Sequence, residues 1–206
     1  MPPSSAADSL PSIRSSLLGD VQQGKSEAWS RFVEIFGPVI YDWCRKHGLP
    51  PCDAEDVAQE VFCRVFEKVP EFVHDKTFRG WLWRITKHKI IDRARHHNRE
   101  PRMLDGSGAL RMLLDAPDEA AIESVEEPSA ADADRLAVRR ALAIIRRNCE
   151  EHIFQAFWRT TVLEQPTADV ARDLGMTVLN VRQSKCRILK RLRCELEGLL
   201  SSSKAK

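Results

Sequence analysis

The sequence contains no apolar run that approaches the roughly 20 residues a helix needs to cross a bilayer, so we expect no membrane insertion. Its first residues, MPPSSAADSLPSIRSSLLG, lack the charged start and continuous apolar core of a secretion signal, and we expect a tail there. Glycine and proline are sparse inside the periodic stretches, and β-branched alternation is nowhere sustained. These absences predict a cytoplasmic chain that is nearly all helix.

The six cysteines follow no regular spacing, which is poor support for a disulfide framework. Two short Cys-x-x-His pairs, Cys44 with His47 and Cys149 with His152, each lack the second half that a zinc site of about four ligands needs. We therefore predict free thiols and no metal site.

The sequence also lacks a glycine-rich phosphate loop, a nucleophile elbow and a paired acid–base constellation. One enzymatic alternative is a metal-dependent nuclease that uses Asp53, Glu55, Asp56 and nearby histidines. On a helix, however, Asp53 and Asp56 would point together while Glu55 would point elsewhere. We accordingly expect no enzyme and no cofactor.

A net charge of only +2 hides a strong segregation of charge along the chain. Residues 76–102 are rich in lysine and arginine, residues 105–134 are mainly acidic, and residues 182–193 carry basic charge without any acid. This pattern predicts two polyanion-binding surfaces joined by a solvated acidic connector.

Apolar residues at helical spacing predict an all-α fold with two small helical domains, each with its own core. Asp53 is the expected N-cap of a helix that should stop at Pro70, and a further helix should run from about Phe78 to Asn98. Glycine, proline and acids between Pro101 and Ala133 favour a flexible linker. The expected domain plan is 1–24 (tail and start of the first helix), 25–102 (first domain), 103–133 (linker) and 134–206 (second domain).

The segment from Thr167 to Cys186 has the residue pattern of a helix-turn-helix. Ala171 allows two helices to cross closely, and Gly175 suits the tight turn between them. The second helix should start after Thr177 as N-cap and turn arginine and glutamine side chains toward solvent, where they could read base edges in the major groove. A plain helical hairpin with a basic face is the alternative interpretation.

In the segment FRGWLWRITKHKIIDRARHH, aromatic residues alternate with cations. This combination suits single-stranded or distorted nucleic acid, because rings stack on bases while cations hold the backbone. We expect Trp81 to be buried in a core and leave Trp83 open between burial and exposure.

Together, DAEDVAQEVF at 53–62, FRGWLWRI at 78–85 and the following Ile91-Asp92 closely resemble conserved region 2 of extracytoplasmic-function (ECF) sigma factors of the sigma-70 family. The helix-turn-helix resembles their region 4. The resemblance implies a transcription initiation factor whose partners are core RNA polymerase, through the clamp helices of its largest subunit and its flap, promoter DNA, and an anti-sigma factor.

The resemblance also assigns roles to single positions. The expected polymerase-docking residues are Asp56, Gln59, Glu60 and Arg64. The expected contacts to the minus-ten element are Phe72, Lys76, Trp83, Arg84, Lys87, His88 and Arg95. The expected contacts to the minus-thirty-five element are Thr177, Arg182, Gln183, Cys186, Arg187 and Lys190.

Some residues depart from the family pattern. His88 stands where an asparagine is common, and Lys89 replaces the small or aliphatic residue that usually follows it. Lys185 and Cys186 also differ from the side chains common at those places. These departures bear on which promoter is read. The remaining alternative is a helix-turn-helix regulator that binds duplex DNA as a dimer without polymerase, which would leave the aromatic and basic helix without a role.

Overall fold

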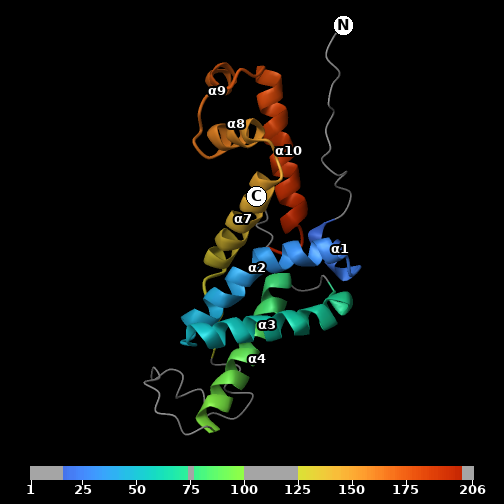
Figure 1. Cartoon of the computed structure of the whole chain (residues 1–206), viewed down its shortest axis with the longest axis vertical. Coiled ribbons are helices and arrows are strands. Elements are labelled where there is room, and N and C mark those ends of the chain that lie inside the picture. Colours follow the sequence, from blue (N-terminus) through green and yellow to red (C-terminus); the bar gives the residue numbers. More distant parts are fainter. Residues whose placement is uncertain (1–15, 74–76, 100–124, 201–206) are drawn as a thin grey trace.

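A computed structural model of the chain describes residues 16–73, 77–99 and 125–200, and within these ranges its regular elements are all helices. The first half comprises α1 (Leu17–Gln22), α2 (Ser26–Lys46), α3 (Pro51–Lys68), the short 3-10 helix η1 (Val69–Glu71) and α4 (Phe78–Arg99). The second half comprises α7 (Ala130–Arg147), α8 (Glu151–Thr161), α9 (Thr167–Asp173) and α10 (Val178–Leu196). The predicted all-α class is confirmed (Figure 1).

The core of the first half lies between α2, α3 and α4. Phe32 and Phe36 of α2 stack on each other and meet Phe78, the first residue of α4, edge-on. Val57, Val61 and Val65 follow one face of α3 and are fully buried against them. Burial of each large apolar side chain contributes about 1.5–3 kcal/mol, so the aromatic residues of α2 and the valines of α3 together stabilise the first half.

Two predicted helix boundaries have different outcomes. The helix that should stop at Pro70 ends at Lys68, because proline cannot continue the hydrogen-bonding pattern of an α-helix. The prediction that Asp53 caps this helix is wrong, since α3 already begins at Pro51 with Pro50 as N-cap. A proline at the first helical position has the right φ angle and loses no hydrogen bond there. Asp53 therefore lies inside the first turn, where its carboxylate pairs with Arg93 of α4.

The helix-turn-helix consists of α9, a turn that includes Gly175, and α10. Gly175 has a φ angle of +63°, a backbone conformation that side chains with a Cβ adopt only under strain. Thr177 is the N-cap of α10, as predicted, and its hydroxyl accepts a hydrogen bond of 3.1 Å from the Asn180 amide. Val170, Ala171 and Val181 pack with Ala156 of α8 in a small core beneath the turn.

The two halves meet in one hydrophobic cluster, and the second half also has two smaller clusters of its own. The expected division into two domains stays a prediction. Small side chains of α7, namely Ala133, Ala137 and Ala141, are buried in the same cluster as the aromatic residues of α2. Leu196, the last residue of α10, and Leu199, just after it, join this cluster as well. Alanine lets α7 approach α2 closely, and sequence periodicity alone does not reveal which face meets which. Residues 103–124 of the expected linker (103–133) lie outside the described residues. The helix α7 begins at Ala130, before the predicted end of the linker.

Ion pairs surround this contact between the halves. Arg31 of α2 lies 2.7 Å from the carboxylate of Glu195, which is only 3% exposed. Arg79 of α4 pairs with Glu127 at 2.9 Å, just before α7, and Arg147 of α7 pairs with Glu34. Nevertheless, the turn of the helix-turn-helix and the final turns of α4 lie at opposite ends of the long axis of the molecule (Figure 1).

Candidate nucleic-acid interface

The first part of the interface is the outer face of α10. The side chains predicted to read DNA on this helix are all exposed: Arg182, Gln183, Cys186, Arg187 and Lys190. On the opposite face, Val181, Ser184 and Ile188 are buried against α8 and α9. The helical repeat thus separates a basic outer face from an apolar inner one, as the sequence predicted.

The first turn of α10 adds exposed apolar residues that were not predicted as part of this face. Leu179 is 62% exposed there, and its neighbour Val178 is partly exposed. An apolar side chain at the start of a recognition helix can contact the methyl group of thymine in the major groove. The signal was available, because both residues directly follow the predicted N-cap.

The aromatic residues assigned to the minus-ten element do not face solvent. Trp83 is 6% exposed; its ring stacks on His47 with centroids 5.2 Å apart and meets Trp43 edge-on. Phe72 is also buried, against Phe78 and Trp81. Trp81, which the sequence predicts to be a buried core residue, is only partly buried and lines a surface groove. The helical turn of α4 thus directs Trp83 toward α2.

Other residues predicted to contact the minus-ten element lie along α4. Arg84 is exposed, whereas Lys87, His88 and Arg95 are half-buried. The His88 ring hydrogen-bonds the carbonyl of Arg84 one turn earlier, which fixes the ring's orientation along the helix. Lys76 lies outside the described residues.

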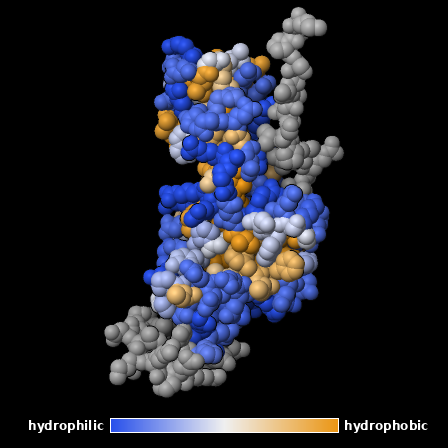
Figure 2. Space-filling view, in the orientation of Figure 1, coloured by the Kyte–Doolittle hydropathy of each residue, from blue (hydrophilic) through white to orange (hydrophobic). Residues whose placement is uncertain are grey.

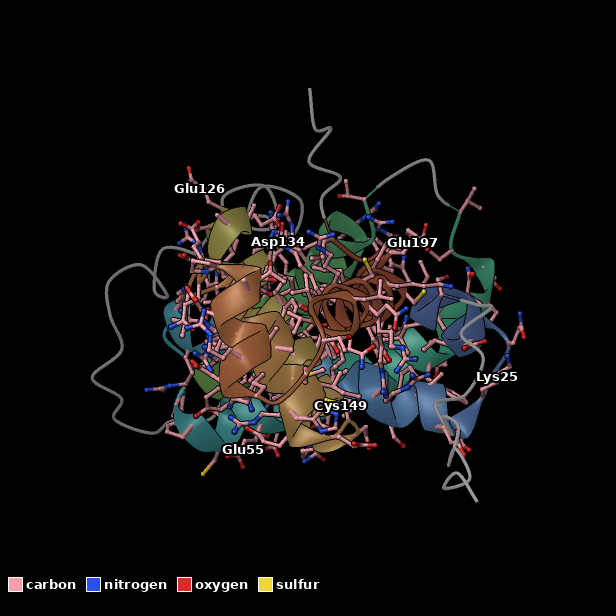
Figure 3. The ribbon with its side chains drawn as sticks, turned by 90° about the horizontal axis from the view of Figure 1, so that it is seen from above. Lys25, Glu55, Glu126, Asp134, Cys149 and Glu197 are labelled. Atoms are coloured by element: carbon pink, nitrogen blue, oxygen red, sulfur yellow. The ribbon has the colours of Figure 1, made fainter. Side chains whose placement is uncertain are left out.

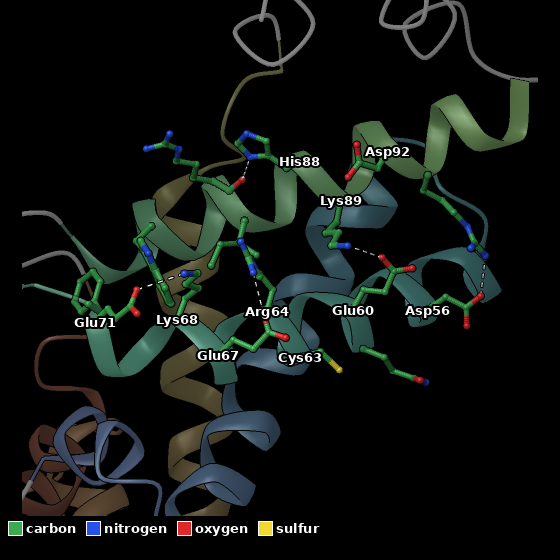
Figure 4. A pocket seen from close by; sticks show the side chains of 16 residues that line it. Asp56, Glu60, Cys63, Arg64, Glu67, Lys68, Glu71, His88, Lys89 and Asp92 are labelled. Carbon is green, nitrogen blue, oxygen red and sulfur yellow. Dashed lines mark hydrogen bonds and ion pairs between the residues drawn. The ribbon is translucent and has the colours of Figure 1, made fainter. Parts of the chain in front are cut away.

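A groove of about 1070 Å³ runs between α3 and α4 (Figure 4). All four residues predicted to dock on polymerase line it: Asp56, Gln59, Glu60 and Arg64. From the other side it is lined by Arg84, His88 and Lys89 of α4. The fold therefore brings the predicted docking residues and part of the predicted strand-binding residues to opposite walls of one groove.

Ion pairs connect the two walls. Lys89 lies 3.0 Å from the carboxylate of Glu60, and Arg93 lies 2.7 Å from that of Asp56 (Figure 4). Arg93 also contacts Asp53 at 2.7 Å. The hydrogen bond to Asp53 is the largest of the contributions that raise the pKa of Arg93 above its ordinary value, and Asp56 adds to it. These pairs were not predicted from the sequence, because they join helices that are distant in sequence.

The described residues give little support to metal chemistry. Within the described ranges, no group of three or more histidine, cysteine or acidic residues has an arrangement that could hold a metal ion. Asp53 and Asp56 do point together, as the helical geometry predicted, but both are directed to Arg93. Glu55 is exposed and lies at the edge of the molecule in the view of Figure 3.

The described cysteines are free thiols, with Cys44 buried and Cys52, Cys63 and Cys186 exposed. Burial raises the pKa of Cys44 to about 12, which keeps it protonated at neutral pH.

Hydrophilic residues cover most of the face drawn in Figure 2, with an apolar patch over the first half. Among the described helices, none is both long and apolar enough to span a membrane.

Comparison with known proteins finds relatives of the first half. The family model "Sigma-70 region 2" matches residues 32–100. The RNA polymerase sigma factor NccH of Alcaligenes xylosoxydans xylosoxydans is 32% identical over 85 residues, which are 41% of this chain and 46% of NccH. The ECF RNA polymerase sigma factor SigW of Bacillus subtilis is 35% identical over 75 residues, 36% of this chain and 40% of SigW. The matches thus span less than half of these relatives.

A solved structure of CnrH in complex with the cytosolic domain of CnrY is also similar. It covers 85% of this chain and 92% of the solved one, with 21% sequence identity and a TM-score of 0.34.

Proposed function

We propose that the chain is a transcription initiation factor of the ECF group of the sigma-70 family, which binds core RNA polymerase and directs it to promoter DNA. The match of residues 32–100 to the sigma-70 region 2 model and the similarity to curated sigma factors support this proposal. In this proposal the polymerase supplies the chemistry, in the cytoplasm, and the chain supplies recognition. The groove between α3 and α4 is the observation that carries the proposal, because it joins docking residues to strand-binding residues.

The outer face of α10 is the proposed reader of duplex DNA at the minus-thirty-five element. Its N-cap at Thr177 and exposed Arg182, Gln183 and Arg187 fit a recognition helix whose first turns enter the major groove. Lys190, further along the helix, suits a phosphate. We add Leu179 to this face as a candidate contact to a thymine methyl group.

The proposed role of the first half is to dock on polymerase and to hold the opened strand at the minus-ten element. Asp56, Gln59, Glu60 and Arg64 would contact the clamp helices of the largest subunit, and Arg84 would contact the strand. Since Trp83 and Phe72 are buried, a direct contact of either ring with a base would require a rearrangement of α2 or of the segment after η1. We also propose the flap and an anti-sigma factor as partners.

Run-off transcription with purified core polymerase tests this function. Core polymerase with the chain should give discrete transcripts from a subset of a genomic promoter library, and core polymerase alone should not. Failure of the chain to associate with core polymerase would overturn the proposal. Specific binding to a duplex together with that failure would instead favour the helix-turn-helix regulator.

A further inference from the structure

Two of the four expected polymerase contacts form ion pairs with α4 in the free chain, and a third, Arg64, pairs with Glu67 of its own helix at 2.9 Å. Glu60 holds Lys89, and Asp56 holds Arg93, in both cases across the groove between α3 and α4. The two pairs are not equivalent. Arg93 also contacts Asp53, whose side chain is 10% exposed, whereas Lys89 and Glu60 have side chains that are 31% and 48% exposed. The Lys89–Glu60 pair is therefore the one that solvent ions or a binding partner can exchange most easily.

Lys89 lies beside side chains with a proposed role in strand binding. It follows His88 directly, and it lines the same groove as Arg84. A lysine at this place adds a positive charge where DNA phosphates would pass, but a carboxylate 3.0 Å away largely cancels that charge. Glu60 consequently has two effects: it presents a negative charge to polymerase and it withholds a positive charge from DNA.

Resting on the proposed function, we propose that Lys89 is a further phosphate contact for the opened strand, that Glu60 holds it back in the free chain, and that polymerase docking releases it. A polymerase cation that pairs with Glu60 would take the place of the Lys89 ammonium, which then turns to the strand. Arg93 keeps Asp53 throughout and anchors α4 on α3. Docking and strand binding are thereby coupled through one side-chain exchange.

The first test uses the free chain and a labelled oligothymidylate at low salt. Glu60→Gln should tighten binding by about two- to fivefold, the range expected when one exposed ion pair is removed. In a Lys89→Met background the same Glu60→Gln change should give no tightening. Glu55→Gln is the matched control, because it removes one negative charge from the same helix at an exposed position outside the groove.

Equal tightening by Glu55→Gln, or equal tightening by Glu60→Gln with and without Lys89, would overturn the proposal. Either result would mean that only the overall field of α3 changes. Circular dichroism melting of each variant checks that the helices remain folded, so that a loss of structure is not read as a loss of binding.

The second test adds core polymerase. Lys89→Met should weaken capture of the oligothymidylate more in the polymerase complex than in the free chain, by about two- to fivefold. An equal effect in both states would contradict the release step. If wild-type chain does not bind core polymerase at all, the proposed function fails, whereas the oligonucleotide comparison of the four variants still decides whether Glu60 restrains Lys89.

Discussion

The helices α10 and α4 both carry rows of cations, but the two rows have different neighbours. On α10, Arg182 and Lys190 project from an exposed face, whereas on α4 Lys89 and Arg93 meet carboxylates of α3. Arg79, near the start of α4, meets Glu127 from the segment before α7. The availability of a basic helix to a polyanion thus depends on what packs beside it. The outer face of α10 is exposed, whereas on α4 Lys89 and Arg93 are held by carboxylates of α3.

The largest expected effect concerns the hydrophobic core against which α4 packs. Phe32→Ala should reduce the free energy of unfolding by about 3–5 kcal/mol, because Phe32 is fully buried and stacked between aromatic neighbours. Urea unfolding followed by circular dichroism measures the loss. Leu179→Ala, at the exposed start of α10, is the control and should change stability by less than about 0.5 kcal/mol. A loss below 1 kcal/mol for Phe32→Ala would contradict the packing described.

A second effect concerns the contact between the halves. Arg31→Met should cost about 2–3 kcal/mol, because it leaves the buried carboxylate of Glu195 without its partner. Adding Glu195→Gln should recover part of this loss, since the buried negative charge is then removed. Thermal unfolding of the single and double variants measures the coupling. Simple addition of the two losses would mean that the pair contributes nothing.

Arg187 tests the open side of the comparison. Arg187→Ala should weaken binding to a cognate promoter by about 1–3 kcal/mol if the guanidinium contacts a base edge, with little effect on stability. Binding to cognate and scrambled duplexes, measured by fluorescence anisotropy, separates the two roles. Equal losses on both duplexes would reduce Arg187 to a phosphate contact.

The smallest expected effect is a pH dependence near α4. Burial, and to a lesser degree the charge of Lys87, lower the pKa of His47, while a hydrogen bond with the backbone of Glu126 opposes this. The folded chain thus favours neutral His47, so its contribution to stability is present above the ordinary histidine pKa and declines as the pH falls below it. Denaturant midpoints between pH 7.5 and 5 should fall less in His47→Phe than in wild type. An identical fall would assign the dependence to other groups.

Local features of this fold could be predicted from the sequence. The N-cap at Thr177 and the exposed face of α10 follow from residues within two helical turns of one another. The stop of α3 before Pro70 has an equally local cause. In each case the decisive interactions lie within one segment, so helical periodicity and turn chemistry are enough.

The features that were missed depend on contacts between segments. Trp83 is buried because α2 presents Trp43 and His47 to it, and Lys89 is paired because α3 places Glu60 across the groove. Aspartate is a favoured N-cap residue, but α3 already begins at Pro51, and Arg93, distant in sequence, binds the Asp53 carboxylate. Helical periodicity identifies which side chains share a face, but it does not identify the neighbour that the face meets.

Ala133, Ala137 and Ala141 make side-chain volume the decisive property where α7 contacts α2. At Ala137 and Ala141, methyl groups leave no room for a larger residue, so even a valine would wedge the two helices apart. Glycine would fit, but it would loosen α7. The distance between the two halves is thus set by alanine side chains. A series of substitutions of graded volume at Ala137 and Ala141 would change that distance step by step.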